Sequence, residues 1–175
     1  MTLSKGARAL TIACSLMVPS ILGAAELKVG DDAPNFSLKA TNGKTYTLAH
    51  YKGRQAVVLA WYPMANTRGC TIECLSLVKD GHLIRQYDVS YFMARGDPLE
   101  DNLAKKTKAD FPMLSDPTKS VATAYDVLSF LGFAKRWTFY INKDGKISKI
   151  DKNIQPKTAA KNIADNLNLL GFKSR

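Results

Sequence analysis

The chain has 175 residues, of which 46% are hydrophobic and 23% charged, and its 25 Lys and Arg exceed its 15 Asp and Glu to give a formal charge of +10. This ordinary globular composition excludes a disordered, collagen-like or coiled-coil protein. The length suits one domain with a substantial hydrophobic core. Three cysteines are too few for a disulfide framework or a four-thiolate zinc site, so they indicate a reactive thiol or a redox pair.

Residues 1–25 have the layout of a secretory signal peptide. Lys5 and Arg8 form a short basic start, an apolar run follows over residues 9–22, and small residues precede a cleavage site after Ala25. The apolar run is short for a membrane span. We therefore expect a periplasmic or otherwise exported protein that contacts the membrane only if this leader stays uncleaved, as an anchor.

The cysteine of the leader raises a second alternative, a lipoprotein. Lipidation of Cys14 is disfavoured because Thr11 stands where a large aliphatic residue is wanted and because the apolar run continues beyond the cysteine. We therefore interpret Cys14 as a residue of the leader that has no functional role of its own. Residues 26–175 remain as the functional domain.

The positive charge of the domain does not by itself indicate nucleic-acid binding. Cleavage after Ala25 removes Lys5 and Arg8 and no anion, which lowers the formal charge from +10 to +8. The lysines are scattered, and the one dense run, residues 105–108, is expected on the solvated face of a helix. Export also argues against DNA, so we expect no nucleic-acid partner.

The first half of the domain predicts a hairpin, a central strand and a helix. Short alternating segments at residues 36–39 and 45–48 flank Asn42-Gly43, a strong signal for a hairpin turn. Residues 55–62 are almost continuously apolar, which is typical of a central strand buried on both faces. A helical spacing of apolar residues follows over residues 70–87.

The second half continues the alternation of strands and helices. A short apolar strand is predicted at residues 89–94, and Asp97-Pro98 and Asp116-Pro117 are each typical of a helix start. Residues 137–141 and 146–150 form a second predicted hairpin, and a last helix runs from Pro156 until Gly171 ends it. The order predicts one α/β domain with a central mixed sheet flanked by helices.

The segment between the central strand and the next helix carries the candidate chemistry. It places Cys70 in the first turn of the helix, where free backbone N–H groups and the positive end of the helix dipole stabilise a thiolate. Thr67 stands three residues earlier, where its hydroxyl can turn back toward the sulfur, and Arg68 adds a nearby cation. The alternative is an ordinary buried cysteine at a helix start.

The pattern Pro63-x-x-x-Thr67-x-x-Cys70 resembles the active-site motif of the peroxiredoxins of the AhpC/TSA superfamily. The likeness spans nearly the whole domain, in segments that follow the order of the family: Gly30-Asp31-x-Ala33-Pro34-x-Phe36, Gly69-Cys70-Thr71-x-Glu73, Phe111-Pro112-x-Leu114-Ser115-Asp116, and Arg136-x-Thr138-Phe139-x-Ile141 with Asp144-Gly145. The second segment is similar to the bacterioferritin-comigratory, or PrxQ-type, branch. The resemblance implies a thioredoxin-like fold and thiol-based reduction of hydroperoxides, served by a thioredoxin-like reductant, with no cofactor and no metal, in a monomer or homodimer.

The resemblance also assigns roles to individual residues. Cys70 is implied to be the peroxidatic cysteine, with Pro63 shielding it and Thr67 orienting the peroxide. Arg136 is implied to stabilise the thiolate and the polarised peroxide. These are the donors that an attack on an O–O bond needs, because charge develops on the departing oxygen. For Glu73 two roles stay open, stabilisation of the helix start and a tie to neighbouring polar groups.

Cys74 is the candidate resolving cysteine. The attack on a peroxide leaves a sulfenic acid on Cys70, which must meet a thiol to be recycled. At a spacing of four residues on one helix, the two Cβ atoms lie about 5–6 Å apart, whereas a disulfide needs about 3.5–4.5 Å. The first helical turn must therefore unwind before the pair closes. The alternative is a buried Cys74 and an external thiol.

Two departures from the branch pattern concern this segment. The branch usually has proline where Arg68 stands, and it commonly places its second cysteine one residue after the position of Cys74. Further on, Ala94-Arg95-Gly96-Asp97 replaces the Ser-x-Asp of the family.

Three other functions fit the sequence less well than a peroxidase. A periplasmic thioredoxin-like thiol-disulfide oxidoreductase needs Cys-x-x-Cys, whereas three residues separate Cys70 from Cys74. A thioredoxin-like copper-delivery protein uses this longer spacing but adds a late histidine, and both His50 and His82 come too early, so we expect them to be ordinary, partly exposed residues. A non-enzymatic interaction module would leave the Thr67, Cys70 and Arg136 set unused.

Overall fold

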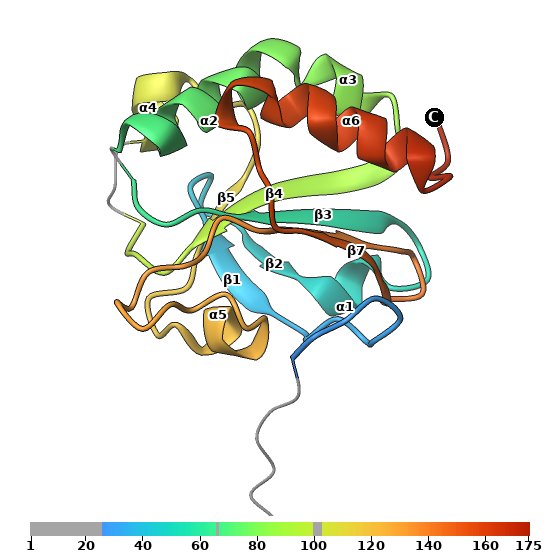
Figure 1. Ribbon diagram of the computed structural model, residues 1–175, viewed down its shortest axis with the longest axis horizontal. Helices are drawn as coiled ribbons and strands as arrows, with labels where there is room; N and C mark the ends of the chain where they lie inside the picture. Colours follow the sequence, from blue (N-terminus) through green and yellow to red (C-terminus); the bar gives the residue numbers. More distant parts are fainter. Residues whose placement is uncertain (1–25, 66, 100–102) are drawn as a thin grey trace, which may run out of the picture.

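The computed structural model describes residues 26–65, 67–99 and 103–175 of the chain. The predicted signal peptide, its cleavage site and Cys14 lie outside the described residues. The described part forms a seven-stranded sheet in the order β2-β1-β5-β4-β3-β6-β7 (Figure 1). Its strands are β1 (Ser37–Ala40), β2 (Thr45–Thr47), β3 (Ala56–Trp61), β4 (Val89–Arg95), β5 (Met113–Ser115), β6 (Thr138–Ile141) and β7 (Ile147–Asp151).

Helices cover both faces of this sheet. They are α1 (Leu48–Tyr51), α2 (Arg68–Asp80), α3 (His82–Arg85), α4 (Leu103–Thr107), α5 (Ser120–Ala124), the short 3-10 helix η1 (Pro156–Thr158) and α6 (Ala159–Leu169). Figure 1 shows α2, α3, α4 and α6 on one side and α1 and α5 on the other. The β3–β4 and β4–β5 pairs are parallel and the others antiparallel, so the predicted α/β architecture with a mixed sheet is confirmed.

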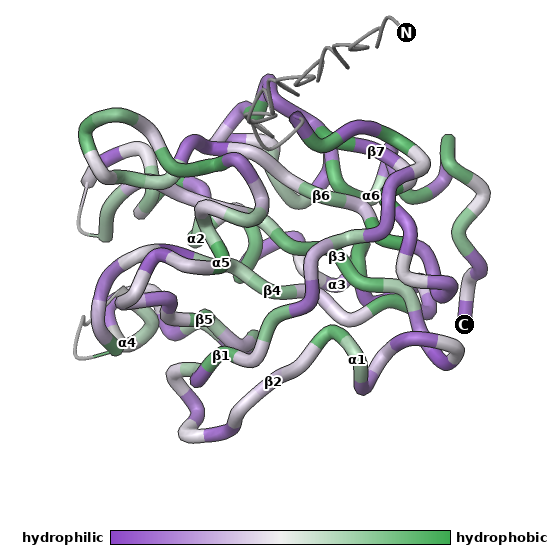
Figure 2. The backbone as a smooth tube through the Cα atoms, turned by 90° about the horizontal axis from the view of Figure 1, so that it is seen from below, coloured by the Kyte–Doolittle hydropathy of each residue, from purple (hydrophilic) through white to green (hydrophobic). Residues whose placement is uncertain are grey.

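Strand β3 is the centre of the core, as its apolar run predicted. All six of its residues are buried, and alternate side chains enter two different hydrophobic clusters. Val57, Leu59 and Trp61 pack on the side of α1 and α5, and Val58 packs on the side of α2 and α6. Figure 2 shows β3 as a hydrophobic segment in the interior. Because helices cover both faces of the sheet, β3 has a continuous apolar sequence rather than an alternating one, although only β4 of its two neighbours is parallel to it.

Both hairpins and the last helix are confirmed. Gly43 has a φ of +79° in the turn between β1 and β2, a conformation that favours glycine. The second hairpin joins β6 to β7, and α6 ends before Gly171, whose φ is +69°. The two hydrophobic clusters of the described residues lie on opposite faces of the sheet. Within the described residues no helix is long and apolar enough to cross a membrane.

The predicted helix over residues 70–87 is divided into two. Helix α2 ends at Asp80, and α3 begins at His82 after Gly81. Gly81 keeps a right-handed backbone, but a Cβ atom there would lie only 2.4 Å from the carbonyl oxygen of Leu77, so the chain passes closer to α2 than a side chain allows. The sequence predicted one helix because α2 and α3 pack on the same side of the sheet, so the helical spacing of apolar residues continues across Gly81.

The two Asp-Pro helix starts were placed wrongly. Residues 97–99 are not helical, and α4 is described from Leu103. Helix α5 begins at Ser120, because residues 116–119 form a turn in which the Lys119 N–H donates to the Asp116 carbonyl oxygen at 2.9 Å. The Asp116 carboxylate still stabilises the start of α5, because its Oδ2 accepts a hydrogen bond from the Ala122 N–H at 2.8 Å.

The pairing of β3 with β6 brings two distant segments together. These strands are antiparallel, with Ala60 opposite Thr138, so the end of β3 lies beside the start of β6. The Trp61 N–H donates to the Trp137 carbonyl oxygen at 2.8 Å and extends this contact beyond the strands. The loop that leads into α2 therefore starts next to the segment that precedes β6.

Replacing Leu59 by alanine tests the central position of β3. Leu59 is fully buried, so Leu59→Ala is expected to lower the free energy of unfolding by about 2–5 kcal/mol, because it removes apolar contacts and leaves a cavity. Denaturant unfolding followed by circular dichroism measures the change.

The matched control is Leu169→Ala on the exposed face of α6, where the side chain is 81% exposed. We expect this change to stay within about 0.5 kcal/mol of the unchanged protein. Equal losses in both variants would contradict a core centred on β3.

Candidate active site

Cys70 lies in the first turn of α2, as the sequence predicted. Thr67 is the residue before the helix and has an extended backbone, and its carbonyl oxygen accepts the Thr71 N–H at 3.0 Å. The N–H groups of the residues between them, Cys70 included, have no partner within the helix because they precede its first complete turn. These donors and the helix dipole favour negative charge on the buried Cys70 sulfur.

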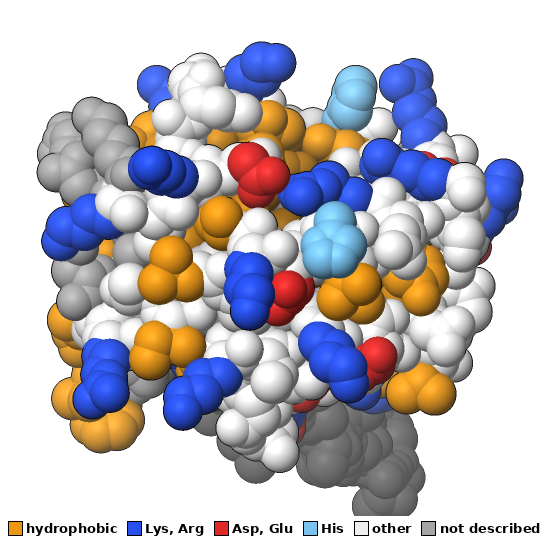
Figure 3. Space-filling model, turned by 90° about the horizontal axis from the view of Figure 1, so that it is seen from above, with side chains coloured by type: hydrophobic (Ala, Val, Ile, Leu, Met, Phe, Trp, Pro, Cys, Tyr) orange, Lys and Arg blue, Asp and Glu red, His pale blue; other side chains and the backbone are white. Residues whose placement is uncertain are grey.

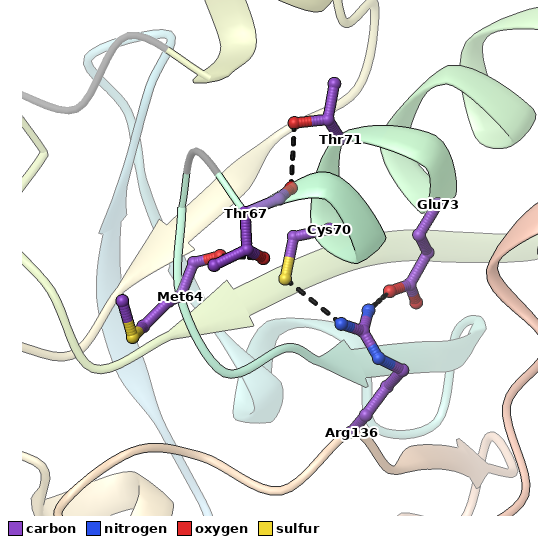
Figure 4. Close-up of polar contacts among 6 residues, drawn as sticks. All are labelled: Met64, Thr67, Cys70, Thr71, Glu73 and Arg136. Atoms are coloured by element: carbon purple, nitrogen blue, oxygen red, sulfur yellow. Dashed lines mark hydrogen bonds and ion pairs between the residues drawn. The ribbon is translucent and has the colours of Figure 1, made fainter.

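Arg136 reaches the sulfur from the segment before β6. Its Nη2 donates to Cys70 Sγ at 3.1 Å, and its Nη1 forms an ion pair with Glu73 (Figure 4). The Glu73 side chain is 2% exposed and the Arg136 side chain 21%. A guanidinium suits this place because its planar fork donates in two fixed directions from one charged group.

The position of Glu73 resolves the two roles that the sequence left open. Cys70 and Glu73 are three residues apart and share one face of α2. The Glu73 carboxylate is therefore turned toward the guanidinium that holds the sulfur, and it ties Arg136 in place. A buried carboxylate without such a partner would be strongly destabilising.

Gly69 is a site residue whose role sequence reasoning missed. A Cβ atom built on Gly69 would lie 3.3 Å from Arg136 Nη2, which is tighter than most contacts of this kind. The absence of a side chain lets the guanidinium come close to the start of α2. The only signal in the sequence was the glycine in Gly69-Cys70-Thr71, and its partner stands 67 positions later.

Thr67 and Pro63 lie in the loop before α2, and Arg68 is the first residue of the helix. The Thr67 hydroxyl donates to the Met64 carbonyl oxygen at 3.3 Å (Figure 4). Pro63 is half-buried just after β3. Arg68 is exposed, and no contact among the described residues joins it to Cys70.

Cys74 is buried one turn after Cys70. Its Sγ shares a hydrogen bond with Thr107 Oγ1 of α4 at 3.0 Å, and both cysteines are free thiols. Burial raises the pKa of the Cys74 thiol, and the hydrogen bond with Thr107 opposes this shift. Cys74 is thus kept neutral and covered while α2 is intact. Thr107 was not anticipated, because it is 33 residues away in the chain.

The histidines and the lysines lie outside this site. His50 and His82 are exposed on α1 and α3, as expected of ordinary surface residues. Among the described residues no group of three or more His, Cys, Asp or Glu side chains is placed to hold a metal ion. Figure 3 shows Lys and Arg side chains spread over the helical face rather than gathered in one patch.

Comparison with known sequences gives one family and several relatives. The model of the AhpC/TSA family matches residues 29–150. The chain is 32% identical to Peroxiredoxin Bcp of Escherichia coli (strain K12) over 133 residues, 71% of this chain and 85% of that protein. It is 29% identical to Peroxiredoxin Bcp of Bacillus subtilis (strain 168) over 141 residues, 75% of this chain and 88% of that protein.

Solved structures show the same fold. Peroxidoxin BcpB from Mycobacterium tuberculosis superposes with a TM-score of 0.73 at 27% identity, covering 82% of this chain and 97% of that one. A mutant of Xylella fastidiosa PrxQ gives a TM-score of 0.75 at 22% identity, covering 83% and 98%. The thioredoxin-like fold expected from the sequence is thereby confirmed.

The environment of Cys74 predicts slow chemical modification. Iodoacetamide reacts with the thiolate, so Cys74 is expected to label far more slowly in the native protein than in the denatured protein. Because its pKa is raised, the labelling rate should keep increasing with pH where that of an ordinary cysteine has levelled off. Peptide mapping by mass spectrometry measures the rate at Cys74 separately from the other cysteines. Equal rates in native and denatured protein would contradict the buried, neutral thiol.

Proposed function

The chain belongs to the AhpC/TSA family and is a peroxiredoxin, a thiol-dependent peroxidase, and from this premise we propose that Cys70 is the cysteine that attacks the peroxide. The observation that carries the assignment is the 3.1 Å hydrogen bond from Arg136 Nη2 to Cys70 Sγ. This contact brings a permanent cation to a sulfur that already lies at the start of a helix. The alternative of a thiol-disulfide oxidoreductase is not retained.

The proposed first step is a displacement at oxygen. The Cys70 thiolate attacks the terminal oxygen of a hydroperoxide, the O–O bond breaks as the S–O bond forms, and the sulfur becomes a sulfenic acid. The departing alkoxide, or hydroxide, takes a proton from water and leaves as an alcohol or as water. Donors directed at the departing oxygen stabilise the charge that develops there. Arg136 and the free N–H groups at the start of α2 are the donors beside the sulfur.

Glu73 acts as a positioning residue in this proposal. It holds the Arg136 guanidinium through an ion pair in which the Glu73 side chain is almost entirely buried. Without the carboxylate, the long Arg136 side chain would regain its rotational freedom and extend into solvent. The carboxylate thus contributes to catalysis indirectly, because it fixes the direction in which Arg136 donates its hydrogen bond to the Cys70 sulfur.

Thr67 and Pro63 complete the pocket for the peroxide. The Thr67 hydroxyl bonds to the Met64 carbonyl oxygen at 3.3 Å, a long hydrogen bond that a bound peroxide can replace when the side chain rotates toward Cys70. The half-buried Pro63 has no N–H of its own and shields the sulfur from water. These two roles come from the family pattern and fit the loop between β3 and α2.

We further propose Cys74 as the resolving cysteine. Its thiolate attacks the sulfenic sulfur of Cys70, the disulfide forms, and the hydroxyl group of the sulfenic acid leaves with a proton as water. The start of α2 must unwind first, and this unwinding also frees Cys74 from Thr107 and from the burial that raises its pKa. A thioredoxin-like protein then reduces the disulfide. The alternative is direct reduction of the Cys70 sulfenic acid by an external thiol.

We also propose that the protein acts outside the cytoplasm. The support is the basic start, the apolar run and the small residues before Glu26 in the sequence. Its catalytic unit would then be residues 26–175, as a monomer or homodimer.

Serine substitutions distinguish the roles of the two cysteines. Cys70→Ser is expected to abolish peroxide consumption, because serine supplies no thiolate, while Cys74→Ser should complete one turnover and stall at the sulfenic acid. A peroxide assay with a thioredoxin system measures both. Sustained, normal turnover of Cys74→Ser would exclude Cys74 as the resolving residue.

The intact mass after one equivalent of peroxide supplies the matching chemical readout. The unchanged protein is expected to lose two hydrogens as the disulfide forms, whereas Cys74→Ser should gain one oxygen. A gain of one oxygen in the unchanged protein would favour the external thiol, and a doubled mass would favour a disulfide between two chains.

Arg136→Met tests the contact that carries the assignment. Removing a donor from the reacting atoms typically lowers the catalytic rate by about 10²–10³-fold, so we expect a loss of that order in kcat/KM for peroxide. Arg136→Lys should recover only part, because an ammonium group keeps the charge but not the fork that serves both Cys70 and Glu73. Arg54→Met, an exposed arginine just before β3, is the control. A loss smaller than that of the control would overturn the role of Arg136.

A further inference from the structure

Three apolar side chains project from the turn between α5 and β6. Phe130 is 96% exposed, Leu131 65% and Phe133 40%, which makes this turn, called here the apolar tip, the densest group of exposed large apolar side chains among the described residues. Other exposed apolar side chains, such as Leu169, stand singly. Exposed apolar groups of this kind typically mark a surface that is covered in function.

The apolar tip is held in shape by its own backbone. The Ser129 N–H donates to the Phe133 carbonyl oxygen at 2.8 Å, and the Gly132 N–H donates to the Ser129 carbonyl oxygen at 2.9 Å. Gly132 has a φ of +79°, a left-handed conformation that glycine adopts without strain. A bridge between Leu128 and Ala134 closes the turn. The exposure of the side chains is thus set by an ordered turn.

Lysines surround the tip. Lys119 Nζ lies 3.2 Å from the position that a Cβ atom on Gly132 would occupy. Lys135 and Lys152 place their ammonium groups over the Trp137 ring, 4.5 and 4.2 Å from its centroid. These three lysines are called here the cationic collar.

Acidic side chains offset only part of the collar. Lys152 pairs with Glu26 at 2.6 Å, whereas Lys135 donates to a backbone carbonyl oxygen, that of Asp126, at 3.1 Å. The Asp116 carboxylate near the start of α5 is buried and accepts the Ala122 N–H. No ion pair joins Lys119 or Lys135 to a carboxylate in the described part of the chain, although Asp126 lies beside Lys135, so the collar keeps positive charge near the apolar tip.

We propose that the apolar tip inserts into the interface of a membrane that contains anionic lipids, with the cationic collar on the lipid headgroups. Apolar and aromatic side chains enter the boundary between headgroups and acyl chains, and nearby lysines add attraction to anionic lipid. Trp137, which follows Phe133 by four residues and lies under the Lys135 and Lys152 ammonium groups, belongs to the residue type that is enriched at this boundary. This contact is separate from the leader, through which alone the sequence predicted membrane binding.

A second copy of the chain fits the same surface less well. A two-fold contact would bring the collar of one chain against that of its neighbour, and like charges repel. The tip offers three side chains, whereas a stable interface buries about 800 Å² on each partner. The surface therefore has the size and charge of a lipid contact.

Docking through the tip would orient the catalytic site. Arg136 stands between Lys135 of the collar and Trp137, and its Nη2 bonds to Cys70 Sγ. One short segment, residues 130–137, thus carries both the tip and the guanidinium that contacts the thiol.

Vesicle sedimentation tests the apolar part of the proposal. A chain that begins at Glu26 is mixed with vesicles of phosphatidylglycerol and phosphatidylcholine, and with vesicles of phosphatidylcholine alone. Binding is expected only to the anionic vesicles and should weaken with added salt. The double variant Phe130→Ser/Leu131→Ser should bind at least about tenfold more weakly, because it removes most of the inserted apolar surface. Leu169→Ser, an equally exposed apolar residue on α6, should bind like the unchanged protein.

A charge-matched pair of variants tests the collar. Lys119→Glu/Lys135→Glu and Lys44→Glu/Lys173→Glu change the net charge by the same amount, but Lys44 and Lys173 are exposed residues far from the tip in the sequence. The collar variant is expected to lose most of the binding and the control only a small part. Equal losses would overturn the proposal, since they would reflect net charge alone.

Two further outcomes would also overturn it. One is equal binding of the tip variant and the unchanged protein. The other is a dimer in solution that the tip variant abolishes, which would assign the tip to self-association. Peroxide consumption in the absence of vesicles should stay unchanged in Phe130→Ser/Leu131→Ser. Failure of the membrane proposal is thereby distinguished from failure of the proposed peroxidase chemistry, which the Cys70 and Arg136 variants test.

Discussion

The structure of the site depends on one guanidinium that serves two partners. Arg136 donates to the Cys70 sulfur with one nitrogen and pairs with Glu73 through the other. Each member needs the others, because the buried carboxylate requires a cation and the sulfur requires a donor to carry negative charge. The arrangement is possible because β6 lies next to β3, which brings the segment before one strand to the end of the other.

The position of Cys70 at the start of α2 was predictable because its signals are local. A continuous apolar run predicted β3, the proline after it marked its end, and the helical spacing that follows placed Cys70 in a first turn. The hairpin turns at Asn42-Gly43 and at residues 142–145 were predictable for the same reason. Such patterns are decided by residues that lie within a few positions of one another.

The remaining features arise from contacts between distant segments. The pairing of Glu73 with Arg136 spans 63 positions and the bond of Cys74 with Thr107 spans 33, and no local pattern encodes either partner. The late start of α5 has a related cause. The Asp116 carboxylate reaches α5 across an intervening turn. The helix therefore begins at Ser120, three residues after the start that Asp116-Pro117 predicted.

The close approach of Gly69 to Arg136 sets a size limit at a position that has no side chain. An alanine there would place its methyl carbon 3.3 Å from Nη2, so the guanidinium would have to yield by a few tenths of an ångström. The hydrogen bond to sulfur is 3.1 Å long, and such a shift would change its length and direction. A substitution at Gly69 would therefore change the contact between the guanidinium and the sulfur without altering either group.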